Sequence, residues 1–98
     1  MKFLCIGDSN TEGYDPRSPI GEIYEKNWPI LLSEYIGIDV INEGISGACV
    51  GTDFSYVLNI MDENDRLIIF LGSNDVYKGH SVEKIEANKQ ILNTYKYV

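Results

Sequence analysis

Three polar segments of this chain carry groups that could perform acyl transfer. Ser9 lies in the first segment, Gly47 closes the second, and Asn74 lies in the third. A serine hydroxyl becomes a nucleophile when a neighbouring base takes its proton. The N–H groups of Ser9 and Gly47, together with the side-chain amide of Asn74, are three donors that could stabilise the oxyanion of an attacked carbonyl. These residues predict a nucleophile and an oxyanion hole.

Each polar segment directly follows an apolar run that is typical of a buried strand. The runs cover residues 3–6, 38–41 and 67–71. Gly7, after the first run, allows the sharp turn that a chain leaving a sheet requires, and a helical turn starting at Ser9 would favour negative charge near its N–H. Three strands are therefore predicted, with one polar segment at the carboxyl end of each.

Helices are predicted between and after these strands. Residues 28–36 have apolar side chains at helical spacing, with Asn27 as the N-cap and Gly37 as the stop signal. Residues 10–27, rich in glycine, proline and polar groups, are predicted to form a long surface loop.

Two further helices complete the pattern. One covers residues 53–61, capped by Thr52 or Asp53, and the last runs from Ser81 to Val98. Strands that alternate with helices imply parallel strands joined by right-handed crossovers, so the predicted class is α/β in a single domain over residues 1–98. All three polar segments then open on the same edge of the sheet, where such folds bind ligands.

The three segments resemble the first three sequence blocks of the SGNH, or GDSL-type, serine ester hydrolase superfamily. They are residues 7–10 (Gly-Asp-Ser-Asn), 42–47 (Asn-Glu-Gly-Ile-Ser-Gly) and 72–75 (Gly-Ser-Asn-Asp). With residues 28–32 (Trp-Pro-Ile-Leu-Leu), the chain is similar to the lysophospholipase and arylesterase branch. The resemblance implies a flavodoxin-like, three-layer α/β/α fold with strand order 2-1-3-4-5, held here through the third strand and the helix after it.

The resemblance also assigns roles to individual residues. Ser9 would be the nucleophile, and Gly47 and Asn74 would complete the oxyanion hole. Asp8 and Asp75 would either support the hydrogen-bonded site or serve as surface and turn residues. Asn10 replaces the leucine of the GDSL name, which leaves the mechanism unaffected.

The fourth family block, Asp-x-x-His, has no counterpart in the sequence. His80 is the only histidine, and no aspartate stands three residues before it. His80 would either touch a substrate at the rim of the site or be a solvated loop residue, since a catalytic base must come within roughly 3 Å of the serine oxygen. Without a base, a serine hydrolase keeps only about 10³ to 10⁴ of its acceleration over water. We therefore expect the N-terminal portion of an ester hydrolase, inactive by itself.

The composition argues against several classes of binding partner. The net charge of -7 argues against nucleic acid and anionic membranes. No signal or membrane-spanning segment is recognisable, so a cytoplasmic location is expected. Cys5 and Cys49 are interpreted as buried fillers without a disulfide, with a catalytic role for Cys49 as the alternative. With a single histidine and no clustered ligands, neither a metal nor another cofactor is expected.

The sequence is also compatible with two functions other than ester hydrolysis. A non-catalytic acyl- or carbohydrate-binding module could keep the oxyanion pocket, and residues 8–13 could cradle a phosphate in a flavodoxin-like binder, although they have no lysine and Glu12 would repel it. The third strand would be an exposed apolar edge, for which the expected cover is a second copy of the chain or the C-terminal half of the hydrolase.

Overall fold

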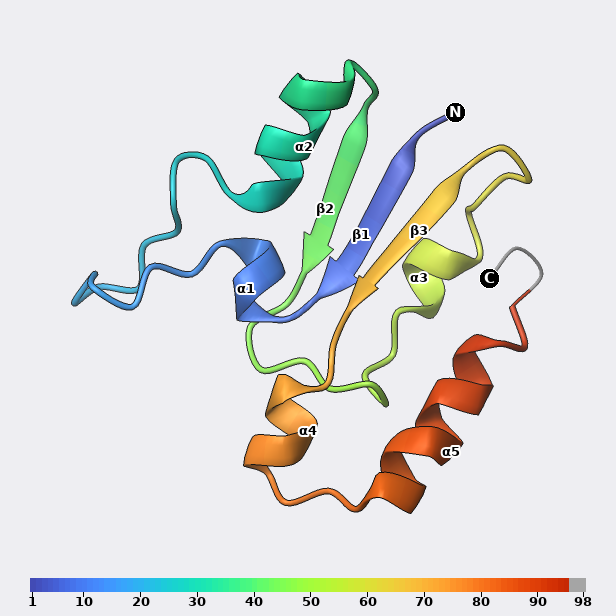
Figure 1. The fold of residues 1–98 in the computed structure, drawn as a ribbon. Coiled ribbons are helices and arrows are strands. Elements are labelled where there is room, and N and C mark those ends of the chain that lie inside the picture. The colour runs from blue at the N-terminus through green and yellow to red at the C-terminus, as the bar shows by residue number, and fades with distance from the viewer. Residues whose placement is uncertain (96–98) are drawn as a thin grey trace.

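The centre of the fold is a parallel sheet formed by the three strands of residues 1–95, the part of the chain that this computed structural model describes. β1 (Phe3–Gly7) lies between β2 (Val40–Gly44) and β3 (Arg66–Phe70) (Figure 1). The α/β class and the strand order 2-1-3 are confirmed.

β2 begins and ends later than its apolar run predicts. Its second half is polar, yet Asn42 pairs with Cys5 and Gly44 pairs with Gly7. The Asn42 side chain is bonded at both ends there, because its Nδ2 donates to the Thr11 carbonyl at 2.7 Å and its Oδ1 accepts from the Gly44 N–H at 2.8 Å. The prediction ended too early because hydrogen bonding, rather than apolar packing, sustains this end of the strand.

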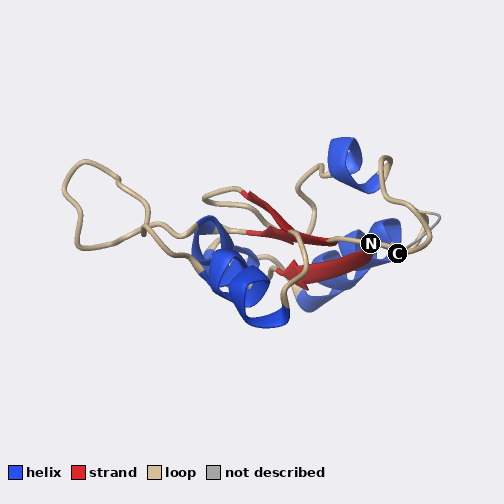
Figure 2. Cartoon of the chain, turned by 90° about the horizontal axis from the view of Figure 1, so that it is seen from above, coloured by secondary structure: helices blue, strands red, loops and turns tan. Residues whose placement is uncertain are grey.

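Helices cover both faces of the sheet, as Figure 2 shows. On one face, Leu4 and Ile6 of β1 pack with α3 (Ser55–Leu58) and α5 (Val82–Leu92). The buried core consists of Leu4, Ile6, Ala48, Val50, Phe54, Val57, Leu58, Met61 and Leu92. On the other face, Trp28 meets Phe70 of β3 edge to face, with ring centroids 6.5 Å apart. The layers are those predicted.

The helix that follows the long loop is confirmed from end to end. α2 is Trp28–Ile36; the Asn27 side chain accepts from the Ile30 N–H at 3.1 Å, and Gly37 ends the helix with φ +67°. The long loop before it projects from the body (Figure 2), and a bridge between Tyr14 and Ile23 closes its base.

The other helices differ from prediction in length. α3 is a single turn, because Asp53 accepts from the Ser55 N–H at 2.9 Å in a tight turn rather than capping a longer helix. α5 has Ser81 as its N-cap, as predicted, and ends at Leu92; residues 96–98 of the predicted helix lie outside the described part. Within residues 1–95, no helix has the length and apolar character needed to cross a bilayer.

Two short helices differ from the prediction: a helical turn was expected at Ser9 but residues 10–12 were assigned to the long loop, and no helix was predicted over residues 73–77. α1 (Ser9–Glu12) follows β1, and α4 (Ser73–Tyr77) follows β3. Each has too few residues for a periodic apolar pattern. Both lie at the carboxyl edge of the sheet and carry the polar segments.

Candidate active site

The three polar segments meet at one edge of the sheet. In Figure 1 the arrowheads of the three strands point toward α1, α4 and the loop after β2. Ser9 is the first residue of α1, Asn74 is the second of α4, and Gly47 lies in the loop. The shared edge was predicted from the alternation of strands and helices.

Hydrogen bonds join the segments. The Asn74 Nδ2 donates to the Ala48 carbonyl at 3.0 Å and lies 3.5 Å from Oδ2 of Asp8. The Ile45 N–H donates to the Gly7 carbonyl at 3.0 Å. These bonds hold Asn74 next to residues of both other segments, and one of the two Asn74 amide contacts is with a backbone carbonyl.

Asp8 places Ser9 at the start of α1. Its side chain accepts from the Asn10 N–H at 2.9 Å, which makes Asp8 the N-cap of this helix. Asp8 is only 2% exposed and faces Asn74. Asp8 is therefore a buried turn residue that also contacts Asn74, and its part in the reaction stays a prediction.

Two glycines let α1 pack directly on the strand ends. A Cβ at Gly7 would lie 2.9 Å from the Phe70 carbonyl oxygen and would collide with the Thr11 side chain. A Cβ at Gly44 would lie 2.9 Å from the Glu12 Cα. Close approach of backbone therefore requires both glycines and fixes the position of Ser9.

Gly47 lies in the loop after β2 with a left-handed backbone. Its φ is +82°, and an added Cβ would meet nothing within 4 Å. The left-handed conformation, rather than lack of space, favours glycine there. Among residues 1–95, neither the Gly47 N–H nor the Ser9 N–H has a hydrogen-bond partner. Both donors are therefore unpaired within these residues.

Asp75 and His80 form a hydrogen-bonded pair that starts from α4, the helix that carries Asn74. Asp75 is fully buried; its Oδ2 accepts from the Val50 N–H at 2.9 Å, and its Oδ1 lies 3.1 Å from Nδ1 of His80. Burial by itself would raise the pKa of Asp75, but the hydrogen bonds from Val50 and His80 outweigh it and hold that pKa below its ordinary value. Asp75 is thus a buried, hydrogen-bonded residue rather than a surface one.

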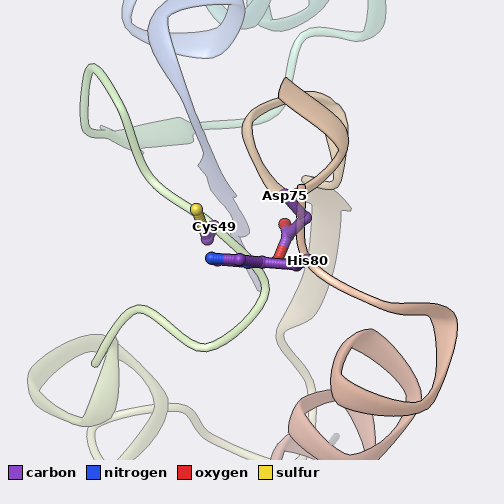
Figure 3. Close-up of side chains that lie close together, drawn as sticks. All are labelled: Cys49, Asp75 and His80. Atoms are coloured by element: carbon purple, nitrogen blue, oxygen red, sulfur yellow. The ribbon is translucent and has the colours of Figure 1, made fainter. Parts of the chain in front are cut away.

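Cys49 completes a cluster that the sequence analysis missed. The Cys49 Sγ, a carboxylate oxygen of Asp75 and a ring nitrogen of His80 all lie within 4.8 Å of one another (Figure 3). The expectation of no clustered ligands is wrong at this place. The cluster could not be predicted from local sequence pattern. Cys49 follows β2, whereas Asp75 and His80 follow β3, and the two segments come together only because β2 and β3 both pair with β1 in parallel.

Comparison with known proteins is consistent with this geometry. Residues 5–97 match the GDSL-like lipase/acylhydrolase family. A G-D-S-L family lipolytic protein from Desulfitobacterium hafniense DCB-2 is 28% identical, with a TM-score of 0.75 over 93% of this chain and 50% of its own. The SGNH-hydrolase family esterase AlinE4 is 26% identical, with a TM-score of 0.70 over 97% of this chain and 54% of its own. The chain thus spans about half the length of these structures. No curated protein matches the sequence significantly.

Proposed function

The chain belongs to the GDSL-like lipase/acylhydrolase family, and we propose that its Ser9 is the nucleophile of an ester hydrolase that works through an acyl-enzyme. In this reaction the Ser9 oxygen attacks the ester carbonyl, the alcohol leaves with a proton, and water then releases the acid. The likeness to the esterase AlinE4 supports ester substrates for this chain.

The observation that carries the proposal is the pair of free N–H donors at the joined segments. The Ser9 and Gly47 N–H groups lack partners among residues 1–95, and Asn74 is hydrogen-bonded between their two segments. Donors fixed before the reaction stabilise the developing oxyanion without reorganisation, and one such donor is worth about 10² to 10³ in rate.

The general base that would take the proton of Ser9 is not assigned to any residue of this chain. The sequence contains no Asp-x-x-His segment, and its single histidine is hydrogen-bonded to Asp75. We therefore propose that the chain alone hydrolyses esters slowly, through the oxyanion hole only, and that a histidine from outside residues 1–98 acts on Ser9. A small ester is the proposed substrate.

An added base tests this proposal directly. p-Nitrophenyl acetate hydrolysis is measured for the chain, for Ser9→Ala, and for the exposed loop variant Ser18→Ala as a matched control. Without additive, we expect the chain and Ser9→Ala to be nearly equal. With imidazole in the buffer, the chain and Ser18→Ala should exceed Ser9→Ala after subtraction of the reaction of free imidazole.

Two results would contradict the proposal. Equal rates in imidazole for all three proteins would mean that Ser9 is not a nucleophile, as expected of a binding module. Fast Ser9-dependent turnover without imidazole would show that a base is already present. His80→Ala then identifies whether that base is His80.

A further inference from the structure

The cluster of Cys49, Asp75 and His80 has no role in the proposed ester hydrolysis, and we propose that it is a binding site for a divalent cation of the zinc class. Cys49 comes from the loop after β2, Asp75 from α4, and His80 from the connection between α4 and α5. Cys49 would bind through its thiolate, Asp75 through a carboxylate oxygen and His80 through a ring nitrogen.

The donor set is the first argument. Thiolate, imidazole and carboxylate are the three ligand types that zinc takes from proteins, and three of them with an open fourth position is a common arrangement. The hard cations Mg²⁺ and Ca²⁺ prefer oxygen ligands only, so a cysteine sulfur selects against them.

The spacing of the donor atoms is the second argument. The three atoms lie within 4.8 Å of one another. Bond lengths of about 2.0 to 2.3 Å place neighbouring ligands of a tetrahedral zinc roughly 3 to 4 Å apart. Small side-chain rotations therefore bring the donors to a common centre. Figure 3 shows the His80 ring reaching from the Asp75 carboxylate to the Cys49 side chain.

Burial is the third argument. Asp75 is fully buried, Cys49 is 8% exposed, and the His80 side chain is 21% exposed. The Val50 N–H holds one carboxylate oxygen of Asp75, which leaves the other on the side of His80. The Asp75 carboxylate is thus held in place, and His80 is the member of the cluster that solvent reaches most.

Charge is the fourth argument. A Cys49 thiolate and the Asp75 carboxylate would together neutralise a 2+ cation, while His80 would bind as the neutral ring. The thiol proton would pass to solvent on binding. The exposed Lys78 donates its Nζ to the Gly47 carbonyl at 3.3 Å.

The same three residues also suggest a cysteine nucleophile with a histidine base, but burial disfavours it. Cys49 is nearly inaccessible, and its Sγ lies 3.8 Å from the Gly47 carbonyl oxygen, which accepts its S–H. A nucleophile must be open to its substrate, whereas a metal ligand is not so restricted. Cation binding is therefore the better use of this cluster.

A bound cation would join two segments of the candidate active site. Cys49 follows Gly47 by two residues, and Asp75 follows Asn74 directly. Fixing Cys49 to Asp75 would hold the Gly47 N–H and the Asn74 amide at a constant separation. The cation would then act on the site by stiffening it.

Cobalt is the probe that tests the site, because a thiolate bound to Co²⁺ gives a charge-transfer absorption that carboxylates and histidine do not. The reduced chain is titrated with Co²⁺, then with Zn²⁺ as competitor. We expect the absorption in the unaltered chain and in Cys5→Ala, the matched control for the other buried cysteine. Cys49→Ser should lose it, and His80→Ala should bind Co²⁺ about 100-fold more weakly.

Zn²⁺ should also raise the melting temperature of the chain and of Cys5→Ala but not of Cys49→Ser, with circular dichroism verifying that each variant is folded. Absence of both the absorption and the thermal shift in the unaltered chain would overturn the proposal. So would an absorption that depends on Cys5, or rapid iodoacetamide modification of Cys49 that Zn²⁺ does not slow, which would mark a reactive thiol instead.

Discussion

β1 and β3 are neighbouring apolar strands of equal length, but they differ sharply in burial. Leu4, Cys5 and Ile6 of β1 are at most 1% exposed, whereas Ile69 and Phe70 of β3 are 42% and 52% exposed. β1 has a strand on each side, while β3 pairs with β1 alone among residues 1–95. A short apolar run therefore predicts a strand, but the number of neighbouring strands determines how deeply that strand is buried.

β3 is apolar on both faces. On one face, Trp28, Ile68, Ile69 and Phe70 line a hollow of about 290 Å³, and on the other face Ile69 and Leu71 line a second one with residues of α5. An edge strand of this kind is prone to pairing with another chain. We propose that a second copy of the chain, or the remaining part of a longer hydrolase, covers it.

The difference in burial between β1 and β3 should have its largest effect on stability when one isoleucine in each strand is replaced by alanine. Ile6→Ala leaves a cavity in the core and should lower the free energy of unfolding by about 2 to 5 kcal/mol. Ile69→Ala removes a half-exposed side chain and should cost less than about 1 kcal/mol. Urea unfolding of both variants gives the comparison, and equal losses would mean that β3 is buried in solution.

The close packing of α1 on the ends of β1 and β2 can be tested in the same way. Gly44→Ala would push a methyl group into the backbone of Glu12 and should cost about 1 to 3 kcal/mol. Gly51→Ala is the matched control, because its Cβ would meet only the end of the Asn88 side chain, which can turn away. Similar unfolding free energies for the two variants would show that α1 is loosely held.

The start of β3 is tied to β1 by an ion pair, which gives a pH dependence. Lys2 Nζ lies 2.8 Å from Oδ2 of Asp65, and the hydrogen bond from Lys2, with others from the backbone, lowers the pKa of Asp65 from 3.8 to about 2. The carboxylate therefore stabilises the fold at pH values above 3.8, and this contribution is lost as the pH falls through about 2.

Asp65→Asn should consequently be less stable than the unaltered chain at neutral pH. The difference should shrink as the pH is lowered from about 4 toward 2, because the carboxylate of the unaltered chain then becomes protonated. Urea unfolding across this range measures it. A difference that stays constant down to pH 2 would mean that Asp65 acts through packing or neutral hydrogen bonds.

The smallest change in folding stability is expected on the exposed edge itself. Ile69→Lys should alter the unfolding free energy by no more than about 1 kcal/mol, yet it should reduce self-association, because an edge charge opposes strand pairing. Tyr35→Lys on α2, where the side chain is 91% exposed, is the matched control. Light scattering that shows the unaltered chain as a stable monomer would contradict pairing through β3.

The sequence predicted those parts of the fold that depend on local pattern. The apolar runs located β1 and β3 to within a residue, and Asn27, Gly37 and Ser81 marked helix ends that the structure confirms. Their signals are strong because a cap or a left-handed glycine acts on its own few neighbours.

Features that depend on distant contacts were missed. The polar end of β2 forms because Asn42 reaches the Thr11 carbonyl, and Cys49 approaches Asp75 and His80 only because the loop after β2 lies next to α4 and the residues that follow it. The segments that carry Ser9, Gly47 and Asn74 were placed at one edge correctly, but their mutual hydrogen bonds could not be predicted. Their catalytic roles stay predictions until the variants are measured.

Within residues 1–95, every backbone position with positive φ is a glycine. Ser9 is therefore presented from an ordinary helical turn, without the strained backbone that often accompanies a functional residue. Stability and activity are then separable at this position. A substitution at Ser9 should leave the free energy of unfolding unchanged. During evolution the hydroxyl could therefore be lost or regained without a change in the stability of the fold.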